Sequence, residues 1–426
     1  MTSESSPLVL EYAEPIDGLR VVRQSPPAGA ASFSATYVGP AGWGFDPTAE
    51  RGVARMVNHL ITTAAGRLDR VALARRLDRA GATLSRDTSP EAAEVTLWGP
   101  ADAWRTLLPV LADVVLRPRF DPEDIARLRR QLFERQLREE TQPASRAERE
   151  LRRAIFPRGH PYRETGLGDR QTVERVDRAA LRRFHRAHYV RTGASIVLTT
   201  RAPLRSVVEA VREEFDDLPR TVPERLELPT LSDRRATTVR IDLVGRSQVE
   251  VRVGGPSIPQ SSPDYPAAFL ANEALGGRPL LGRLFQRVRE QNGLAYHASS
   301  HLDSMRLGGS WTAAAGTGPE RWKKVVPMLE EEVDRLRRQG LPQGELDSVR
   351  TSAIGEMALA LESTSDAHEL AVEAAYHELP RDYWATWPER LRAVTPADVR
   401  RAARRAFDPN RSATVVVGPL RPPRDV

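Results

Sequence analysis

The sequence contains no cysteine, so disulfide bonds, thiolate metal sites and a cysteine nucleophile are all excluded. It has no run of about 18 apolar residues, the length that a membrane-spanning helix requires. The first residues, MTSESSPLVLEYAEP, show neither the basic region nor the apolar region of a secretory leader. We therefore expect a cytoplasmic protein that crosses no membrane. At 426 residues the chain exceeds one ordinary hydrophobic core, which predicts two domains.

Lysine is nearly absent, because Lys323 and Lys324 are the only two and arginine supplies the other basic groups behind the formal charge of +6. The arginines mostly alternate with acidic residues on predicted helices, as in RAERELRR at 146–153. Such faces usually form solvated ion pairs one helical turn apart. No aromatic interleaving and no glycine-rich phosphate loop accompany them, so we expect binding of neither nucleic acid nor nucleotide.

The chain repeats itself without gaps at an offset of 218 residues. A capped helix beginning near Val176 leads through Tyr189 to a β-branched strand, and the same order recurs from Val394 through Phe407. Solenoid repeats have periods of about 20–50 residues, so a repeat this long indicates a duplicated domain.

The two halves are separated by a proline-rich segment without periodicity, 217–236, which we predict to be a linker. The predicted domains are then 1–216 and 237–426. In each half, strands come first and a set of long helices precedes a last strand. This order predicts an α+β fold in which each domain has a mainly antiparallel sheet backed by helices.

The segment Leu275–Tyr296, LGGRPLLGRLFQRVREQNGLAY, predicts a helix, a turn and a strand. Pro279 suits the first turn of a helix, and Gly293 suits its end. One apolar stripe is expected along the helix, formed by Leu280, Leu281, Leu284, Phe285 and Val288. This corner would bring Arg289, in the last helical turn, near Tyr296 at the start of the strand.

A second helix is predicted at 48–65, with an apolar side that includes Val53 and Val57. Helical spacing places Arg55, Asn58 and His59 together on its other side.

The sequence of this helix resembles the zinc helix of the pitrilysin/insulinase family, the inverzincins, whose motif is H-x-x-E-H. In that family two histidines bind zinc, the glutamate is the general base, and a distant glutamate is the third ligand. Here Arg55 and Asn58 take the first two positions, and His59 alone matches; the distant ligand would fall near Glu134 or Arg135. A guanidinium has no lone pair for a metal, and a catalytic zinc needs three protein ligands. We therefore expect no metal and no cofactor in this chain.

The resemblance continues through almost the whole chain in order, including the duplication. It passes through Phe120-Asp-Pro, His160-Pro-Tyr162 and Gly166-Leu-Gly168, and then through both domain-closing strands. The fold of the family is therefore expected throughout.

Family members carry an arginine and a tyrosine in an R-E-x-x-G-L-A-Y context, and Arg289-Glu-Gln-Asn-Gly-Leu-Ala-Tyr296 keeps both. In the family these groups lie across the cavity from the zinc and touch the bound peptide. The resemblance implies that Tyr296 donates to the oxyanion at the scissile carbonyl and that Arg289 holds a neighbouring carbonyl. Taken as a short motif alone, the pair is better explained by Tyr296 packing in a strand and Arg289 pairing with Glu290 or a nearby acid, and the resemblance along the whole chain reverses this preference.

Some subfamilies of these peptidases are heterodimers, in which one subunit keeps the zinc motif and the other keeps the Arg/Tyr pair. The resemblance implies that this chain is the second kind, a subunit inactive alone that serves peptide bound at the zinc of a homologous partner. The alternative is a non-catalytic scaffold or peptide-binding subunit of a larger complex. An autonomous zinc peptidase is disfavoured, because two of the three helix positions fail.

Four further histidines could belong to a site. His185 and His188 lie one turn apart in an arginine-rich helix without nearby acidic ligands, and a surface or helix-end role is expected. His297 and His301 lie on the Tyr296 strand. Strand alternation should point His297 away from Tyr296, which argues against a shared site.

Overall fold

The first of two β-sheets has the strand order β1-β2-β6-β3-β5-β4. The computed structural model describes residues 9–231 and 237–420. The strands of this sheet are β1 (Glu11–Ile16), β2 (Leu19–Gln24), β3 (Ser32–Gly39), β4 (Thr83–Thr88), β5 (Ala93–Pro100) and β6 (Ala194–Thr199). Neighbours run antiparallel except β2 and β6, which are parallel.

The second sheet has the order β7-β11-β8-β10-β9. Its strands are β7 (Thr237–Asp242), β8 (Val249–Ser257), β9 (Ala295–Ser304), β10 (Gly309–Thr317) and β11 (Ala413–Gly418). Only β7 and β11 pair in parallel. The predicted α+β fold with two mainly antiparallel sheets is confirmed.

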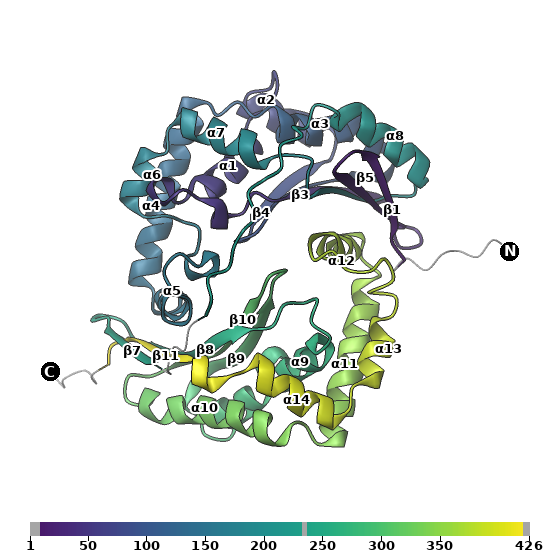
Figure 1. Cartoon of the computed structure of the whole chain (residues 1–426). Coiled ribbons are helices and arrows are strands. Elements are labelled where there is room, and N and C mark those ends of the chain that lie inside the picture. Colours follow the sequence, from purple (N-terminus) through teal and green to yellow (C-terminus); the bar gives the residue numbers. More distant parts are fainter. Residues whose placement is uncertain (1–8, 232–236, 421–426) are drawn as a thin grey trace. The chain divides into compact units, whose positions relative to one another are not determined.

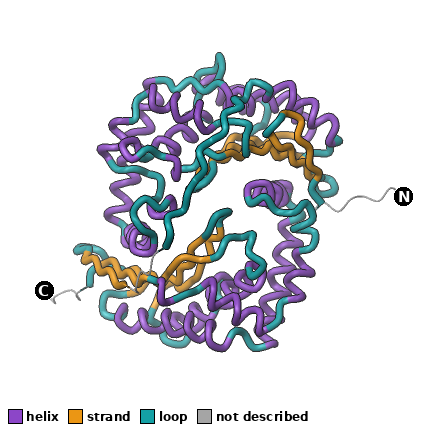
Figure 2. The backbone as a smooth tube through the Cα atoms, viewed as in Figure 1, coloured by secondary structure: helices purple, strands orange, loops and turns teal. Residues whose placement is uncertain are grey.

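Helices make up most of the remaining described chain (Figure 2). The α-helices are α1 (Val53–Ile61), α2 (Arg70–Arg79), α3 (Trp104–Leu116), α4 (Pro122–Thr141), α5 (Pro143–Ile155), α6 (Arg170–Arg175), α7 (Arg178–His188), α8 (Leu204–Phe215), α9 (Tyr265–Asn272), α10 (Trp322–Gln339), α11 (Gln343–Ala360), α12 (Thr364–Tyr376), α13 (Trp387–Ala393) and α14 (Pro396–Ala406). The 3-10 turns are η1 (Trp43–Phe45), η2 (Thr48–Glu50), η3 (Ala101–Ala103), η4 (Pro161–Arg163) and η7 (Pro409–Arg411), and η5 (Glu273–Gly277) and η6 (Phe285–Glu290) are π-helical.

By packing, the chain divides into two compact units. The first unit contains the described residues up to Glu134 together with Gly166–Glu227 and Glu356–Trp387. The second contains Arg135–Thr165, Leu228–Gly355 and the described residues from Pro388 onward. Each unit therefore includes helices from the opposite half of the sequence. The boundaries at 216 and 237 remain a prediction about the sequence repeat.

In the first unit, helices cover both faces of the six-stranded sheet (Figure 1). α1, α3, α7 and α8 lie over one face, where Phe33, Ala35 and Tyr37 of β3 are fully buried in the main hydrophobic core. α12 lies against the other face, over β6 and β3. Successive side chains of a strand point to opposite faces, so the residues between the apolar ones face α12.

The face toward α12 carries hydroxyl groups instead of an apolar layer. His368 of α12 is 1% exposed, with Nδ1 2.8 Å from the Thr199 hydroxyl and Nε2 2.7 Å from that of Thr36. The Thr36 hydroxyl lies 2.7 Å from that of Thr96, and the Thr199 hydroxyl donates to Oε1 of Gln24 at 3.0 Å. One imidazole thus joins α12 to hydrogen-bonding groups of four strands.

In the second unit, α5 packs against β8 and β11, while α9, α10 and α14 line the opposite face of the sheet (Figure 1). The apolar contact of α5 is made by Ala147, Leu151 and Ile155 with Val415 and Val417. Beside it, Glu148 accepts from Arg152 and from Arg252 of β8, both at 2.8 Å. These contacts fasten a helix of the N-terminal half to the C-terminal sheet.

The predicted repeat has structural counterparts at both ends. α7, Tyr189 and β6 follow one another in the first unit, and α14, Phe407 and β11 follow in the same order in the second. Both aromatic side chains are at most 1% exposed, so each closes its helix by packing into a core.

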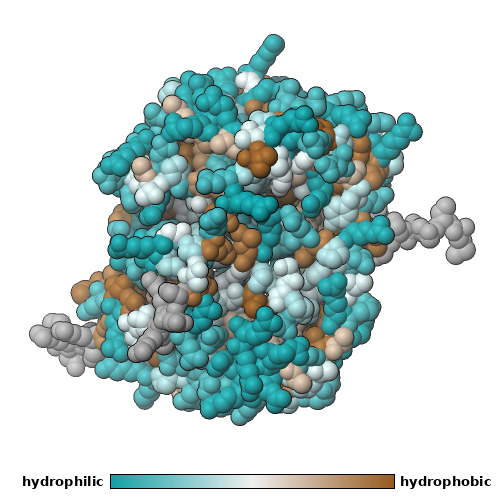
Figure 3. Space-filling view, in the orientation of Figure 1, coloured by the Kyte–Doolittle hydropathy of each residue, from teal (hydrophilic) through white to brown (hydrophobic). Residues whose placement is uncertain are grey.

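The face drawn in Figure 3 is mainly hydrophilic, with small separate apolar patches. Among the described residues, no helix is long and apolar enough to cross a membrane.

Candidate functional site

The N-terminus of α1 is held by a partly buried carboxylate that the sequence did not single out. Gly52 takes the left-handed conformation before the helix, with φ of 100°. The Asp46 side chain accepts from the backbone N–H groups of Gly52 at 2.6 Å and Ala54 at 2.9 Å, and these bonds favour an anion at a helix start. Burial nevertheless raises the pKa of Asp46 to about 7. The acidic residue just before the helix was the available signal.

Asn58, predicted to lie on the same side of the helix as Arg55 and His59, is buried. It is 1% exposed, and its amide nitrogen donates to the carbonyl oxygens of Asp87 at 2.6 Å and Glu94 at 3.3 Å. Helical spacing alone does not show that β4 and β5 cover this position. An ionised glutamate here would face two carbonyl oxygens without a hydrogen to offer, so the site suits an amide.

Arg55, in the first turn of α1, lies over an aromatic ring. Its guanidinium carbon is 5.1 Å from the centre of the Trp43 ring, a cation–π distance.

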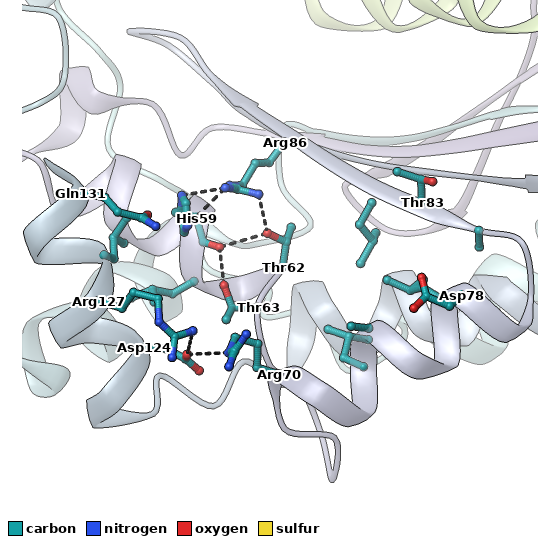
Figure 4. A pocket seen from close by; sticks show the side chains of 17 residues that line it. His59, Thr62, Thr63, Arg70, Asp78, Thr83, Arg86, Asp124, Arg127 and Gln131 are labelled. Atoms are coloured by element: carbon teal, nitrogen blue, oxygen red, sulfur yellow. Dashed lines mark hydrogen bonds and ion pairs between the residues drawn. The ribbon is translucent and has the colours of Figure 1, made fainter. Parts of the chain in front are cut away.

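His59 is engaged by an arginine of β4 (Figure 4). Nη2 of Arg86 lies 2.7 Å from Nδ1 and 3.3 Å from Nε2 of the ring, and Nη1 donates to the Thr62 hydroxyl at 3.1 Å. A guanidinium only donates, so the bonded ring nitrogen must hold a lone pair and the imidazole is neutral. A permanent cation on the single matching ligand opposes the binding of a second cation there.

A pocket of about 520 Å³ opens beside this contact (Figure 4). Its lining comes from α1, α2, β4 and α4 and comprises His59, Leu60, Thr62, Thr63, Arg70, Leu73, Ala74, Leu77, Asp78, Ala82, Thr83, Leu84, Arg86, Asp124, Arg127, Leu128 and Gln131. Glu134 and Arg135, the two positions considered for the distant ligand, are exposed and outside this lining. Within 9–231 and 237–420, no group of three or more His, Cys, Asp or Glu residues could hold a metal ion.

We expect the isolated chain to contain no stoichiometric zinc. The physical reason is the Arg86 guanidinium on His59 together with the lack of two further ligands. Metal analysis after dialysis against micromolar zinc tests this. One zinc ion per chain, lost on replacing His59 with Ala, would contradict it.

The Arg289/Tyr296 corner is built as a π-helix, a turn and a strand. Leu284, Phe285 and Val288 are at most 8% exposed and anchor η6 in the second unit. The N–H of Leu294 bonds the carbonyl of Val288 at 2.9 Å, and Gly293, with φ of 60°, makes the turn. The predicted end of the helix and the start of the following strand are confirmed.

The predicted start of this helix is wrong. Pro279, Leu280 and Leu281 form a turn, the two leucines are 61% and 63% exposed, and the helix begins only after Gly282. A Cβ on Gly282 would lie 2.6 Å from the Cα of Gly276, so two glycines let the loop close on itself. Apolar spacing alone does not reveal this backbone contact.

Leu280 has a φ of 64°, which side chains other than glycine adopt at a cost of about 1 kcal/mol. We expect Leu280→Gly to raise the free energy of unfolding by about 0.5–1 kcal/mol. The matched variant Leu281→Gly should lower it by a similar amount, because Leu281 has no positive φ. Urea unfolding of both proteins checks the pair, and equal changes would contradict the strain at Leu280.

Tyr296 is the extra residue of a β-bulge. Thr317 of β10 pairs with Ala295 and Gly316 pairs with His297, which leaves Tyr296 without a partner residue and 64% exposed. The Arg289 side chain is 45% exposed, stacks over Phe285 at 4.8 Å and lies 3.9 Å from Glu290. In the described part of the chain no hydrogen bond joins the two side chains. The corner thus presents both groups to solvent.

The bulge also invalidates the alternation argument for His297. Bulges re-aim side chains, so neighbouring residues there need not point to opposite faces. Nε2 of His297 lies 3.5 Å from the buried Glu250 carboxylate of β8, and a Cβ on Gly316 would overlap the imidazole ring. The imidazole of His297 therefore lies over Gly316, where the lack of a side chain lets it approach Glu250. The sequence shows no sign of this pair, which depends on strand register.

The two histidines of α7, His185 and His188, have structural roles. His185 is partly buried, donates to the carbonyl of Val115 at 2.7 Å and stacks on Tyr189, and its desolvation lowers the pKa to about 4. His188 packs against Phe45 and Phe184. The helix-end role is confirmed for both, although they are more enclosed than expected.

Two sequence profiles match the chain in tandem. One described as "Insulinase (Peptidase family M16)" matches residues 20–168, and one described as "Peptidase M16 inactive domain" matches residues 175–353. The two matches share one family and follow one another along the chain.

The similar proteins include several that are described as zinc proteases and one that is described as a non-peptidase homolog. An uncharacterized zinc protease of Streptomyces coelicolor is 30% identical over 269 residues, which cover 60% of this chain and 56% of that protein. One of Mycobacterium bovis is 27% identical over 352 residues, or 82% and 79% of the two chains. A non-peptidase homolog of Helicobacter pylori is 19% identical over 349 residues, or 82% and 80%.

A solved structure has the same fold. The peptidase M16 inactive domain from Pseudomonas fluorescens superposes with a TM-score of 0.90 at 21% identity, over 98% of this chain and 99% of the other. At that identity the likeness concerns the fold alone.

Proposed function

The chain belongs to the M16 peptidase family, and from this premise we propose that it is the subunit of a heterodimeric metallopeptidase that binds no zinc itself. In this proposal a homologous subunit carries H-x-x-E-H and the zinc. This chain contributes Arg289 and Tyr296 to peptide bound there. The predicted cytoplasmic location belongs to the same proposal.

One contrast between two parts of the chain carries the proposal. At α1 the motif positions serve other contacts, since Arg55 lies over Trp43, Asn58 binds backbone carbonyls and His59 binds Arg86. At the Arg/Tyr corner both side chains are exposed to solvent, and Tyr296 is the extra residue of a β-bulge. A purely structural tyrosine in a strand would instead be expected to bury its ring.

In this proposal the chain contributes electrostatic stabilisation of the bound peptide and of the charge that develops on it. A zinc ion held by the H-x-x-E-H residues of the partner would supply the Lewis acid for the scissile carbonyl and for the attacking water. As that carbonyl becomes tetrahedral, its oxygen gains negative charge, and the Tyr296 hydroxyl is the donor that can stabilise it. The Arg289 guanidinium, always charged, can hold a neighbouring peptide carbonyl and fix the register of the substrate.

The second candidate is a scaffold or peptide-binding subunit without a part in catalysis. The Helicobacter pylori relative described as a non-peptidase homolog favours it. The two candidates differ in what Arg289 and Tyr296 do after assembly.

The test is reconstitution with a relative that carries H-x-x-E-H. Equimolar mixing should yield a complex in size-exclusion chromatography and should raise cleavage of an unfolded peptide above that of either protein alone. A mixture that neither associates nor cleaves faster would refute the proposed pairing.

A further inference from the structure

We propose that two copies of this chain pair through β7, in the one antiparallel register that sets Arg240 of each copy opposite Asp242 of the other. β7 is the outermost strand of the second sheet and is bonded on one side only, to β11 (Figure 1). Within residues 9–231 and 237–420, no strand pairs with its other side, which is the β7 edge. An open edge of this kind is a template for a further strand.

The backbone groups at the β7 edge belong to alternate residues. The N–H groups of Thr237 and Leu243 donate to carbonyl oxygens at the two ends of β11, at 3.4 and 2.9 Å. In a strand the N–H and C=O groups of successive residues point to alternate sides. Those of Thr238, Arg240 and Asp242 therefore point away from β11. These even-numbered residues are the ones that a second strand can bond.

The β7 edge also carries one positive and one negative side chain. Arg240 and Asp242 are exposed and, being two residues apart, lie on the same face of the strand. The guanidinium carbon of Arg240 is 5.8 Å from the centre of the Trp322 ring, and Asp242 accepts from the N–H of Leu420 at 3.1 Å. Among the described residues neither side chain forms an ion pair, so both charges are uncompensated.

These two charges select one register for a pair of identical strands. When Arg240 lies opposite Asp242 of the second copy, two-fold symmetry repeats the contact, and both contacts attract. A shift of two residues sets Arg240 opposite Arg240, or Asp242 opposite Asp242, and like charges directly opposite repel. A shift of one residue turns the bonded backbone groups away from the partner. Charges on an edge usually repel a second copy, whereas this pattern attracts one.

The same register joins apolar groups on the other face of the strand. Ile241 lies opposite itself on the two-fold axis, and Val239 lies opposite Leu243. All three are partly buried and pack against the apolar cluster under α5, so pairing extends that cluster. Each chain has one β7, and the assembly therefore closes at two copies.

This interface goes beyond the proposed function and is compatible with it. β9, the strand of Tyr296, is at the opposite end of the sheet from β7. Pairing through β7 therefore leaves the β9 end of the sheet open to peptide and to a zinc-bearing partner.

The experiment is sedimentation velocity of the isolated full chain over two decades of concentration. We expect a reversible monomer–dimer equilibrium in the micromolar range, because two short strands bury less area than the about 1,200–2,000 Å² of a standard interface. Added salt should weaken the dimer, since the attracting charges are exposed.

Charge reversals assign the register. Arg240→Asp and Asp242→Arg should each weaken self-association about tenfold, because symmetry turns two attractions into two repulsions. A double variant with both changes should restore it. An equimolar mixture of the two single variants should form a heterodimer, in which each Asp again lies opposite an Arg. Arg205→Asp is the matched control, since Arg205 is 90% exposed, pairs with Glu209 and lies in the first unit.

A disulfide reports the same register independently. Ile241 and its copy form a pair without hydrogen bonds between them, whose Cα atoms lie about 4.5 Å apart, within disulfide reach. The chain has no cysteine, so Ile241→Cys introduces a single thiol. Diamide should oxidise the two thiols of a dimer to one disulfide, seen on a non-reducing gel. Val244→Cys is the control, because Val244 is 86% exposed but lies opposite Thr238 in this register.

Four results would overturn the proposal. They are a monomer at every concentration, a dimer that neither reversal weakens, no recovery in either the double variant or the mixture, and cross-linking by Val244→Cys without cross-linking by Ile241→Cys. Recovery in the mixture shows that the single variants are folded. Because no zinc-bearing partner is present, failure here leaves the pairing experiment untouched.

Discussion

In the complex with a zinc-bearing partner, Tyr296→Phe should lower turnover by roughly 10²–10³-fold, the usual cost of removing one oxyanion donor. The substitution removes only the hydroxyl. Since 64% of the residue is exposed and the bulge is a backbone feature, fold and assembly should remain intact. The ratio kcat/KM should fall with kcat while KM changes little, because the lost bond forms only in the transition state.

Tyr265→Phe is the control, since Tyr265 opens α9 in the same unit and lies away from the corner in sequence. It should leave turnover within twofold. Retention of full turnover by Tyr296→Phe would remove Tyr296 from the catalytic account, and a rise in KM alone would assign it to substrate binding.

His368→Ala should lower the free energy of unfolding by about 3 kcal/mol. The change leaves the buried hydroxyls of Thr36 and Thr199 short of a partner, and each such loss costs about 1–3 kcal/mol, offset by rearrangement among the hydroxyls. Guanidinium unfolding measures the effect. His301→Ala, at an exposed position on β9, should change it by less than 0.5 kcal/mol, as surface substitutions usually do. Equal stabilities of the two variants would contradict the network.

The same histidine predicts a pH dependence. Burial lowers the pKa of His368 to about 3, so the folded chain resists a proton that the unfolded chain accepts near pH 6.5. Its stabilising contribution is therefore complete above pH 6.5 and declines as pH falls, by roughly 3 kcal/mol at pH 4. His160 and His185, with pKa values lowered to about 4, act in the same direction. Asp46 and Glu94, raised to about 7, act in the opposite direction between pH 7 and 4.

Subtracting the free energy of unfolding of the His368→Ala variant from that of the unsubstituted protein isolates the contribution of His368. The difference in free energy of unfolding should shrink between pH 7 and pH 4. A difference that stays constant over this range would show that His368 is not held neutral.

Local patterns predicted the fold well where each element is defined by its own residues. The repeated helix, aromatic and strand at Val176 and Val394 were found because caps and β-branched runs are local signals. The turn at Gly293 was found for the same reason. The pattern misplaces Leu280 and Leu281, because the loop closes through a backbone contact between Gly276 and Gly282 that apolar spacing does not reveal.

The candidate site was predicted less completely because its contacts join separate elements. Helical spacing places Asn58 beside Arg55 and His59 but does not reveal that its amide binds the carbonyls of β4 and β5. The Arg86–His59 contact and the His297–Glu250 pair depend on packing and strand register. Residue spacing within one sequence does not predict which arginine side chain contacts which histidine ring. The residue types at α1 predict only that the zinc motif is incomplete.

The most direct test of the account is peptide cleavage by the mixed complex with Arg289 and Tyr296 both replaced by Ala. The account predicts that the double variant binds the zinc-bearing partner as tightly as the unsubstituted chain but leaves cleavage at the partner's own rate. Full cleavage by the double-variant complex would contradict it and would make this chain a scaffold.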